Sequence, residues 1–439
     1  MKTKKWLIHV INHALTHDAH SFAQLDPSAY LDAERRRAGF DTGQQVDRLS
    51  DALQETLGVS ISEYHSVNLL VHACELAASL LKGCHRTVIG YEIMACIAAT
   101  LGQFDLVNAA LLHRGGEHKD EEGCQIDELA IKLGHLYLQA SPQLSGRFST
   151  HPIVLFREWL DYTRIGQFAI LFDKLRDTDC PLPADSQMLA INADAENRLR
   201  RMVSSAAALA SADGIIDPPE QKLIESLIKR AGLSDADAVI AVEELRHPQL
   251  PSKLVQPQAS LPERAFLYRL LFLGAYINGE HHESERAYIQ SLACEFGDDE
   301  SMLLNCEEIA LANFTDNFAD LNLAPKDSVL ATVHSVLFKR FGGALERHRD
   351  RLLAEVQETA ELLELIKVSR ERPLTRDEEK RVREQAIDLL KAIPALAIFI
   401  SPGGTLLLPL VIKYLGIELR PSSFIDDVRL GESKGSVDE

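Results

Sequence analysis

The middle of the chain reads Ala212-Asp213-Gly214-Ile215-Ile216-Asp217-Pro218-Pro219-Glu220, and this stretch decides the fold. A second copy opens with Asn278-Gly279, 65 positions after Asp213-Gly214. In both copies a Glu stands seven positions after the first residue, and an Ile-x-Ser-Leu motif follows it. The pair predicts one helical domain that is built from two similar halves.

The first copy has the residues of a turn followed by a helix start. Gly214 makes the turn, because a glycine adopts left-handed backbone angles without a steric penalty. Asp217 is a favourable N-cap, and Pro218 suits the first helical position, where its missing N–H costs nothing. Glu220 stands at the third helical position, so Asp217 and Glu220 have the spacing of a capping box. The spacing predicts a helix over 218–231 that ends at Gly232.

The same stretch must be compared with a calcium-binding loop. Asp213-Gly214 and Glu220 match the second half of an EF-hand loop, which would place the first ligand at Leu209. The equivalent residue of the second copy is Gly274. Neither side chain carries an oxygen, and Ca²⁺ takes oxygen ligands. The sequence therefore excludes an EF-hand.

An Asp-Gly-x-Ile-Asp-x-x-Glu turn after an Ala-rich helix, with a degenerate copy 65 residues later, resembles the TerB-like tellurite-resistance family. The resemblance covers residues 195–315. It implies a compact helical domain of the kind found in bacterial stress-response proteins and membrane-associated co-chaperones. It also implies a divalent-metal site on the acidic turn residues, which here are Asp213, Asp217, Glu220, Glu283 and Glu285. Helix capping is the alternative role, because Asp and Glu are favoured at helix starts in any case.

Composition sets limits on the class of protein. The chain has 439 residues and a formal charge of −19, which disfavours DNA binding because phosphate contacts need clustered Lys and Arg. Seven cysteines occur without a Cys-x-x-Cys pair. Cysteines in apolar contexts such as 94–97 predict reduced, buried side chains in a cytoplasmic protein.

Residues 1–190 have the apolar periodicity of helices and predict an N-terminal helical domain of no recognised family. The two prolines of 177–185 predict a domain boundary. Near the N-terminus, His9, His13 and His17 recur at every fourth position and share one helix face. This spacing suits a metal ion, and the alternative is a polar helix face that happens to use His.

The C-terminal part continues with connecting helices over 325–372, including one long helix over 345–370. Pro373 breaks this pattern, and Thr375 and Glu378 have capping-box spacing for the next helix. An uncharged run of 21 residues follows at Ala392–Ile412. Its length suits a bilayer span, but prolines and glycines divide it, so 392–415 predicts either membrane association or a buried hairpin.

Ile393-Pro394, Leu407-Leu408-Pro409 and Leu419-Arg420-Pro421-Ser422-Ser423-Phe424 resemble the start of a LETM-type domain. The resemblance covers residues 375–424, within a predicted LETM-like helical segment at 373–424. It implies a link to cation/proton exchange and to ribosome binding, although the helical region that follows in that family has no counterpart here. Residues 425–439 are predicted to be a disordered tail.

Together these patterns predict an all-α, multi-helical protein with a TerB-like domain between two other helical regions. No nucleotide-binding glycine loop, nucleophile elbow or zinc-hydrolase motif occurs, so we expect a protein that is not an enzyme. The leading hypothesis is a bacterial stress-response or ion-homeostasis protein in which a TerB-like interaction or sensing module carries a membrane-docking tail. It would be cytoplasmic or bound to the inner face of the cytoplasmic membrane. The alternatives are a fully soluble adaptor that binds protein or the ribosome, and a metal-ion sensor that uses the acidic turns.

Overall fold

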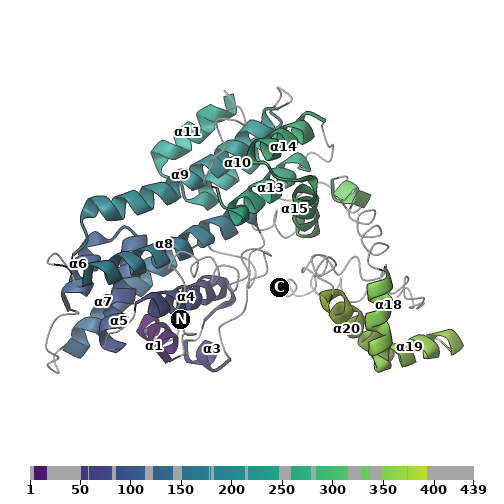
Figure 1. Cartoon of the computed structure of the whole chain (residues 1–439), viewed down its shortest axis with the longest axis horizontal. Coiled ribbons are helices and arrows are strands. Elements are labelled where there is room, and N and C mark those ends of the chain that lie inside the picture. Colours follow the sequence, from purple (N-terminus) through teal and green to yellow (C-terminus); the bar gives the residue numbers. More distant parts are fainter. Residues whose placement is uncertain are drawn as a thin grey trace, which may run out of the picture. The chain divides into compact units, whose positions relative to one another are not determined.

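The structure is a computed structural model. It describes residues 4–16, 51–57, 59–81, 86–113, 122–141, 151–176, 178, 182–212, 216–246, 259–277, 283–314, 329–333, 335–336, 349–372 and 374–392. Within these ranges the regular secondary structure is α-helical, with no strand (Figure 1). The predicted all-α class is therefore confirmed.

The helices of the N-terminal half are α1 (Trp6–Thr16), α3 (Asp51–Leu57), α4 (Ile61–Leu80), α5 (Arg86–Thr100), α6 (Phe104–His113), α7 (Glu122–Ala140), α8 (Pro152–Arg176) and α9 (Asp185–Ala210). Those that follow are α10 (Pro218–Ala231), α11 (Asp235–Arg246), α13 (Leu261–Ala275), α14 (Glu283–Phe296), α15 (Glu300–Ala312), α18 (Arg349–Glu358), α19 (Ala360–Glu371) and α20 (Arg376–Ala392).

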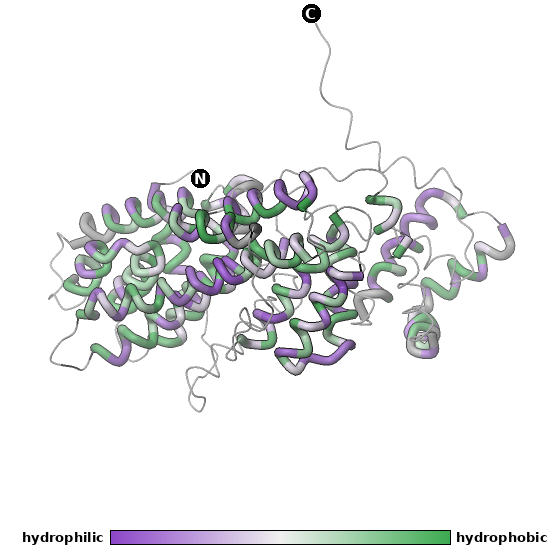
Figure 2. The backbone as a smooth tube through the Cα atoms, turned by 90° about the horizontal axis from the view of Figure 1, so that it is seen from above, coloured by the Kyte–Doolittle hydropathy of each residue, from purple (hydrophilic) through white to green (hydrophobic). Residues whose placement is uncertain are grey.

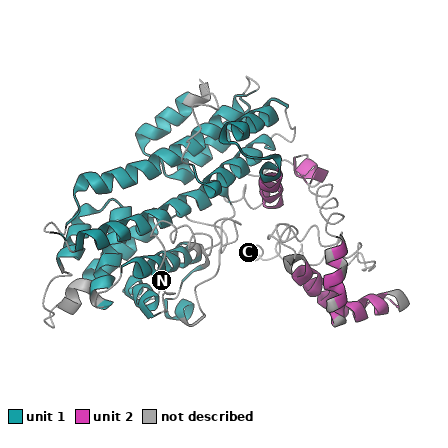
Figure 3. Cartoon of the chain, viewed as in Figure 1, with its two compact units in different colours: residues 1–303, 317–324 teal, residues 304–316, 325–439 magenta. Residues whose placement is uncertain are grey.

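The chain divides into two compact units (Figure 3). The first comprises residues 1–303 and 317–324, and the second comprises 304–316 and 325–439. Hydrophobic and hydrophilic residues both occur along the helices of the first unit (Figure 2).

Helix α8 lies at the centre of the first unit. It packs against α4 and α5 from the N-terminal region and against α9, α10 and α13 from the following region. Trp159 and Phe156 stack with a centroid distance of 5.5 Å, and Phe266 of α13 lies 5.8 Å from Phe156. Helix α8 therefore contacts helices on both sides of the predicted boundary at 177–185.

The start of α8 is capped by a buried histidine. Pro152 occupies the first helical position, and the Nδ1 atom of His151 accepts a hydrogen bond from the Ile153 N–H at 3.2 Å. Burial lowers the pKa of His151 to about 3, and the positive charge of Arg230 acts in the same direction. His151 is therefore neutral in the folded protein at neutral pH.

The end of α8 is held by a buried ion pair. Arg176 contacts both carboxylate oxygens of Glu92 on α5, with Nη2–Oε2 at 2.5 Å and Nε–Oε1 at 3.1 Å. The Glu92 side chain is fully buried. A buried carboxylate is costly unless a fitted cation pairs with it, and a bidentate guanidinium supplies that partner.

Near the start of α8, in its second turn, Arg157 bridges the C-terminal ends of two other helices. Its Nη2 donates to the Ala140 carbonyl at the end of α7 at 2.8 Å, and its Nη1 donates to the Arg230 carbonyl of α10 at 3.4 Å. A cation suits these carbonyls, because the last carbonyls of a helix have no intrahelical partner. The adjoining Gly232 has a φ of 66°, as predicted for a glycine that ends a helix.

The second unit contains α18, α19 and α20, which pack on one another. The prediction of one long helix over 345–370 was wrong, because the chain breaks at Thr359 between α18 and α19. The Thr359 hydroxyl donates to the Glu355 carbonyl at 3.0 Å, a local bond of the kind that bends helices. The capping box before α20 is confirmed, since the Thr375 N–H donates to Glu378 at 2.8 Å. Arg372 lowers the pKa of Glu378 to about 2.

Two further sequence predictions concern membranes and cysteines. Among the described residues, no helix has the length and apolar character that crossing a membrane requires. Most of the 392–412 run, and with it most of the predicted LETM-like segment, lies outside the described residues. Cys74, Cys96 and Cys306 are buried as predicted, whereas Cys294 is exposed.

The two glycines that end α10 and α14 provide a matched pair of substitutions. Gly297, with a φ of 73°, has open space where a Cβ would lie, whereas a Cβ at Gly232 would lie 2.9 Å from Nη1 of Arg157. Gly297→Ala should reduce the free energy of unfolding by about 1 kcal/mol through its left-handed backbone alone. Gly232→Ala should cost about 2 kcal/mol because it also displaces Arg157. Urea denaturation measures both values, and equal losses would show that the Arg157 bridge contributes nothing.

The cap of α8 makes stability depend on pH. The pKa of His151 is about 3 in the folded protein, and an unfolded histidine titrates near 6.5, so the unfolded state binds a proton first. Stability is fully present above about pH 6.5 and falls as the pH drops toward 3. From pH 7 to pH 5 the histidine should remove about 2 kcal/mol.

His151→Asn keeps a good N-cap residue but removes the titrating group. Between pH 7 and pH 5, the free energy of unfolding of this variant should therefore fall by about 2 kcal/mol less than that of the wild type. His135→Asn, on the exposed face of α7, serves as the control and should keep the wild-type pH dependence. If the stability of the His151→Asn protein depended on pH as strongly as that of the wild type, His151 would not be the cause of the pH dependence.

Candidate functional site

The predicted internal repeat is present as two pairs of helices, α9–α10 and α13–α14. Helix α9 ends at Ala210 and α13 ends at Ala275, which is 65 positions later. Helices α10 and α14 are 14 residues long and also start 65 positions apart. The ends of α9 and α13 are therefore followed at the same spacing by helices of the same length.

Equivalent residues of the two helix pairs face each other. Nη1 of Arg198 on α9 lies 3.2 Å from Oε2 of Glu263 on α13, and these residues are 65 positions apart. Eleven positions further along, a Cβ at Gly274 would lie 3.2 Å from Cδ2 of Leu209, which is its own equivalent. Because both ends of this stretch match in register, α9 and α13 pack side by side in parallel.

The acidic turn residues do not share one environment. Glu220 and Glu285 stand at equivalent positions in the first turns of α10 and α14, and both are buried. The Glu220 carboxylate accepts a hydrogen bond from the Asp217 N–H at 2.8 Å, so it caps its own helix. Asp217 and Glu283 are exposed, and Asp213 lies outside the described residues.

No group of three or more His, Cys, Asp or Glu side chains within the described ranges is arranged to hold a metal ion. On α1, His9 is exposed and His13 is partly buried, while His17 lies outside the described part. The metal sites on the acidic turns and on the three histidines each include a residue that the structure does not describe. Both sites remain predictions.

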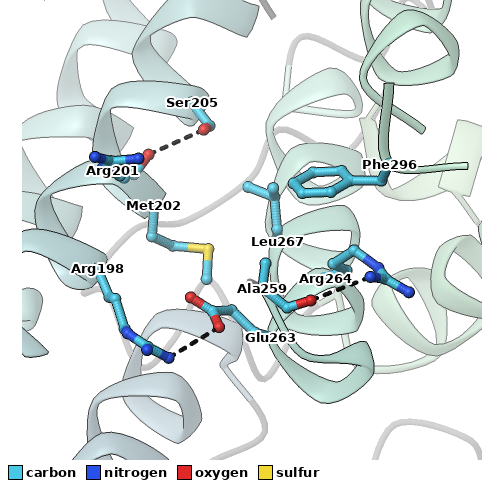
Figure 4. A pocket seen from close by; sticks show the side chains of 9 residues that line it. All are labelled: Arg198, Arg201, Met202, Ser205, Ala259, Glu263, Arg264, Leu267 and Phe296. Atoms are coloured by element: carbon cyan, nitrogen blue, oxygen red, sulfur yellow. Dashed lines mark hydrogen bonds and ion pairs between the residues drawn. The ribbon is translucent and has the colours of Figure 1, made fainter. Parts of the chain in front are cut away.

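A pocket lies beside the α9–α13 contact, with Phe296 of α14 on its rim (Figure 4). Its volume is about 30 Å³, which is enough for one functional group of a partner. Its lining residues are Arg198, Arg201, Met202, Ser205, Ala259, Glu263, Arg264, Leu267 and Phe296.

The arginine from α9 is held by carboxylates on two sides. Nε of Arg198 lies 2.9 Å from Asp194 on the same helix, and Nη1 lies 3.2 Å from Glu263. Figure 4 shows the Arg198 side chain extended toward Glu263 of α13. Glu263 is buried, which requires a cation of this kind beside it.

The arginine from α13 is held by one carboxylate and one backbone carbonyl. Nε of Arg264 lies 2.9 Å from Asp298, and its Nη1 donates to the Ala259 carbonyl at 3.1 Å. The guanidinium also lies 5.7 Å from the centroid of the Phe296 ring, within the range of a cation–π contact. Tyr268 donates to the same Asp298 carboxylate at 2.7 Å, which fixes that carboxylate in turn.

Between these charged groups the pocket is apolar. Met202 extends from α9 toward α13 in Figure 4, and Leu267 and Phe296 lie across from it. The hydroxyl of Ser205 donates to the Arg201 carbonyl at 2.9 Å, so it serves its own helix. Oriented guanidinium N–H groups beside an apolar surface suit the recognition of a carboxylate that has an apolar neighbour.

None of the charged pocket residues was singled out as a site from the sequence. One signal was present: Arg198 and Glu263 occupy the same position of the repeat and carry opposite charges. That signal becomes informative only when equivalent positions are known to face each other, which depends on how α9 and α13 pack.

Residues 161–307 match a protein family described as "Protein of unknown function (DUF533)". DUF533 is a TerB-like family, so the predicted resemblance is confirmed for this region, with a start inside α8 rather than at residue 195. The comparisons with known proteins do not support the LETM-like resemblance of residues 375–424. No curated protein and no solved structure matches the chain.

The contact between equivalent residues has a measurable energy. In a double-mutant cycle with Arg198→Ala and Glu263→Ala, we expect a coupling energy of about 1 kcal/mol, because both side chains are largely withdrawn from water. The Arg381–Glu361 pair of the second unit serves as the control. Its side chains are 52% and 47% exposed, so its coupling energy should be only about 0.3 kcal/mol. Equal coupling in the two cycles would contradict this view of the α9–α13 contact.

Proposed function

We propose that residues 161–307 form a non-enzymatic interaction module whose pocket beside α9 and α13 receives an acidic side chain of a protein partner. The module belongs to a protein of the bacterial stress-response or ion-homeostasis type, in line with the TerB-like resemblance. The observation that carries the proposal is the orientation of Arg198 and Arg264. Two carboxylates hold Arg198, and one carboxylate and a backbone carbonyl hold Arg264.

Preorganised arginines suit recognition for two reasons. A guanidinium has five N–H donors, and the contacts described engage Nε and one Nη of Arg198 and of Arg264, so further donors of each remain for a partner. Because the side chains are already fixed, binding loses little conformational entropy. Arginine is also among the residues that most often dominate interface energies.

The size and chemistry of the pocket also support recognition over catalysis. It accommodates one side chain rather than a cofactor, since typical ligand pockets measure roughly 300–1,000 Å³. Its hydroxyl group, that of Ser205, bonds to a backbone carbonyl rather than to a general base.

The test is affinity purification of the full-length protein after cross-linking in bacterial cells, with partners quantified by mass spectrometry. Arg198→Gln combined with Arg264→Gln should lower the recovery of specific partners by about tenfold or more, since hydrogen bonds to charged groups contribute roughly 1.5–3 kcal/mol. Arg286→Gln, on the exposed face of α14, is the matched control and should leave recovery unchanged.

Melting curves show whether each variant is folded. Unchanged recovery with a folded double variant would place the recognition surface elsewhere and overturn the proposal.

The finer part of the proposal is that 392–415 docks this module at the inner face of the cytoplasmic membrane. Its support is the uncharged run Ala392–Ile412 and the basic residues of the preceding helix α20, which are Arg376, Lys380, Arg381, Arg383 and Lys391. Fractionation of the same cells separates this version from a fully soluble adaptor. If the segment docks at the membrane, the full-length protein should be found in the membrane pellet, and deletion of 393–415 should release it into the supernatant.

The metal-sensing alternative assigns the acidic turns as ligands, and calorimetric titration of the full chain with Ca²⁺ and Zn²⁺ decides it. Heat that is lost in Asp217→Asn would favour a sensor, and the absence of heat would leave the acidic residues as helix caps.

A further inference from the structure

A second cavity lies between α1 and α5, outside residues 161–307. It has a volume of about 330 Å³, roughly ten times the space of the α9–α13 pocket. This volume falls within the range of ligand-binding pockets, about 300–1,000 Å³. The lining residues are Ile8, Ile11, Asn12, Leu15, Thr16, Arg86, Gly90 and Met94.

Among the described residues, the lining is mostly apolar and carries a single charged side chain. Ile8, Ile11 and Leu15 follow one face of α1 at helical spacing, and Met94 of α5 adds a flexible apolar side chain. The charged residue is Arg86, which is exposed and is the first residue of α5. The N–H groups in the first turn of a helix have no intrahelical acceptors and favour a nearby anion.

Gly90 enlarges this cavity without being needed for close packing. A glycine inside a helix costs about 1 kcal/mol relative to alanine, so its presence requires a reason. Among the described residues, a Cβ at Gly90 would meet only Cγ2 of Ile11, at an ordinary contact distance of 3.8 Å. Gly134 of α7 shows the opposite case, since a Cβ there would lie 2.9 Å from Nε1 of Trp6. Gly134 allows two groups to touch, whereas Gly90 keeps space open.

We propose that this cavity binds a single-chain amphiphile with an anionic head, namely a medium-chain fatty acid. The carboxylate pairs with Arg86 at the start of α5, and the acyl chain lies along Ile8, Ile11, Leu15 and Met94. A lone cation beside an apolar cavity selects a ligand with one negative end and one apolar body. The cavity is too small for a lipid with two full acyl chains. The proposal is independent of the function assigned to residues 161–307.

The test is calorimetric titration of the full-length protein with hexanoate, octanoate and decanoate, each below its micelle concentration. Each added methylene should tighten binding by about fourfold until the cavity is filled, because burying a CH₂ contributes about 0.8 kcal/mol. Decanol, which has the same chain and no charge, should bind about tenfold more weakly than decanoate.

Substitutions locate the binding site. Arg86→Gln should weaken decanoate binding by about tenfold or more, and Arg86→Lys should restore most of it. Gly90→Leu should abolish binding by filling the cavity. If Gly90→Leu does not fold, Leu15→Glu at a partly exposed position places a repelling carboxylate in the same cavity. Arg286→Gln on α14 is the control and should bind decanoate as the wild type does.

Three results would each overturn the proposal: no binding of decanoate, affinity that does not rise with chain length, or unchanged affinity in a folded Arg86→Gln protein. Loss of partner recovery in the Arg198/Arg264 variant would not affect it, because that variant leaves the α1–α5 cavity intact.

Discussion

The first unit depends on the burial of α8, a single helix of 25 residues with apolar side chains around most of its circumference. A helix that is apolar around most of its circumference must pack against several other helices. Helix α8 meets this requirement by packing against α4 and α5 on one part of its surface and against α9, α10 and α13 on another. Its start is fixed by the neutral cap His151, and its end is fixed by the Arg176–Glu92 ion pair. The N-terminal helices and the TerB-like helices therefore pack against the same helix, α8.

The second constraint is the parallel contact of α9 and α13, which brings equivalent positions of a repeat together. At such a contact, identical charged residues would repel each other across a short distance. The two copies differ where they meet: Arg198 faces Glu263, and Leu209 faces Gly274. The glycine makes room for the leucine, and the opposite charges attract. The divergence of the two copies is thus explained by packing, and it creates the charged wall of the pocket.

Local signals allowed the sequence to predict the parts of the fold that short segments determine. The helix start at Asp217-Pro218, its end at Gly232 and the capping box of Thr375 and Glu378 follow from neighbouring residues alone, and all are present. The break at Thr359 escaped prediction because it interrupts an apolar stripe that is compatible with one long helix. The central role of α8 and the pocket arginines were missed for another reason. They depend on contacts between residues far apart in the chain, and helical periodicity specifies which face is buried but not which partner covers it.

The two cavities of the first unit differ in the forces that they can use. The α9–α13 pocket is small and bordered by charged groups that the protein has already paired, so it favours directional contacts with one group of a partner. The α1–α5 cavity is larger and its described lining carries one charge, so most of its binding energy must come from apolar surface removed from water. Helix α8 packs against α5, which lines the larger cavity, and against α9 and α13, which line the smaller one. A displacement of α8 would therefore alter the walls of both cavities, because close-packed helices transmit strain rather than absorb it.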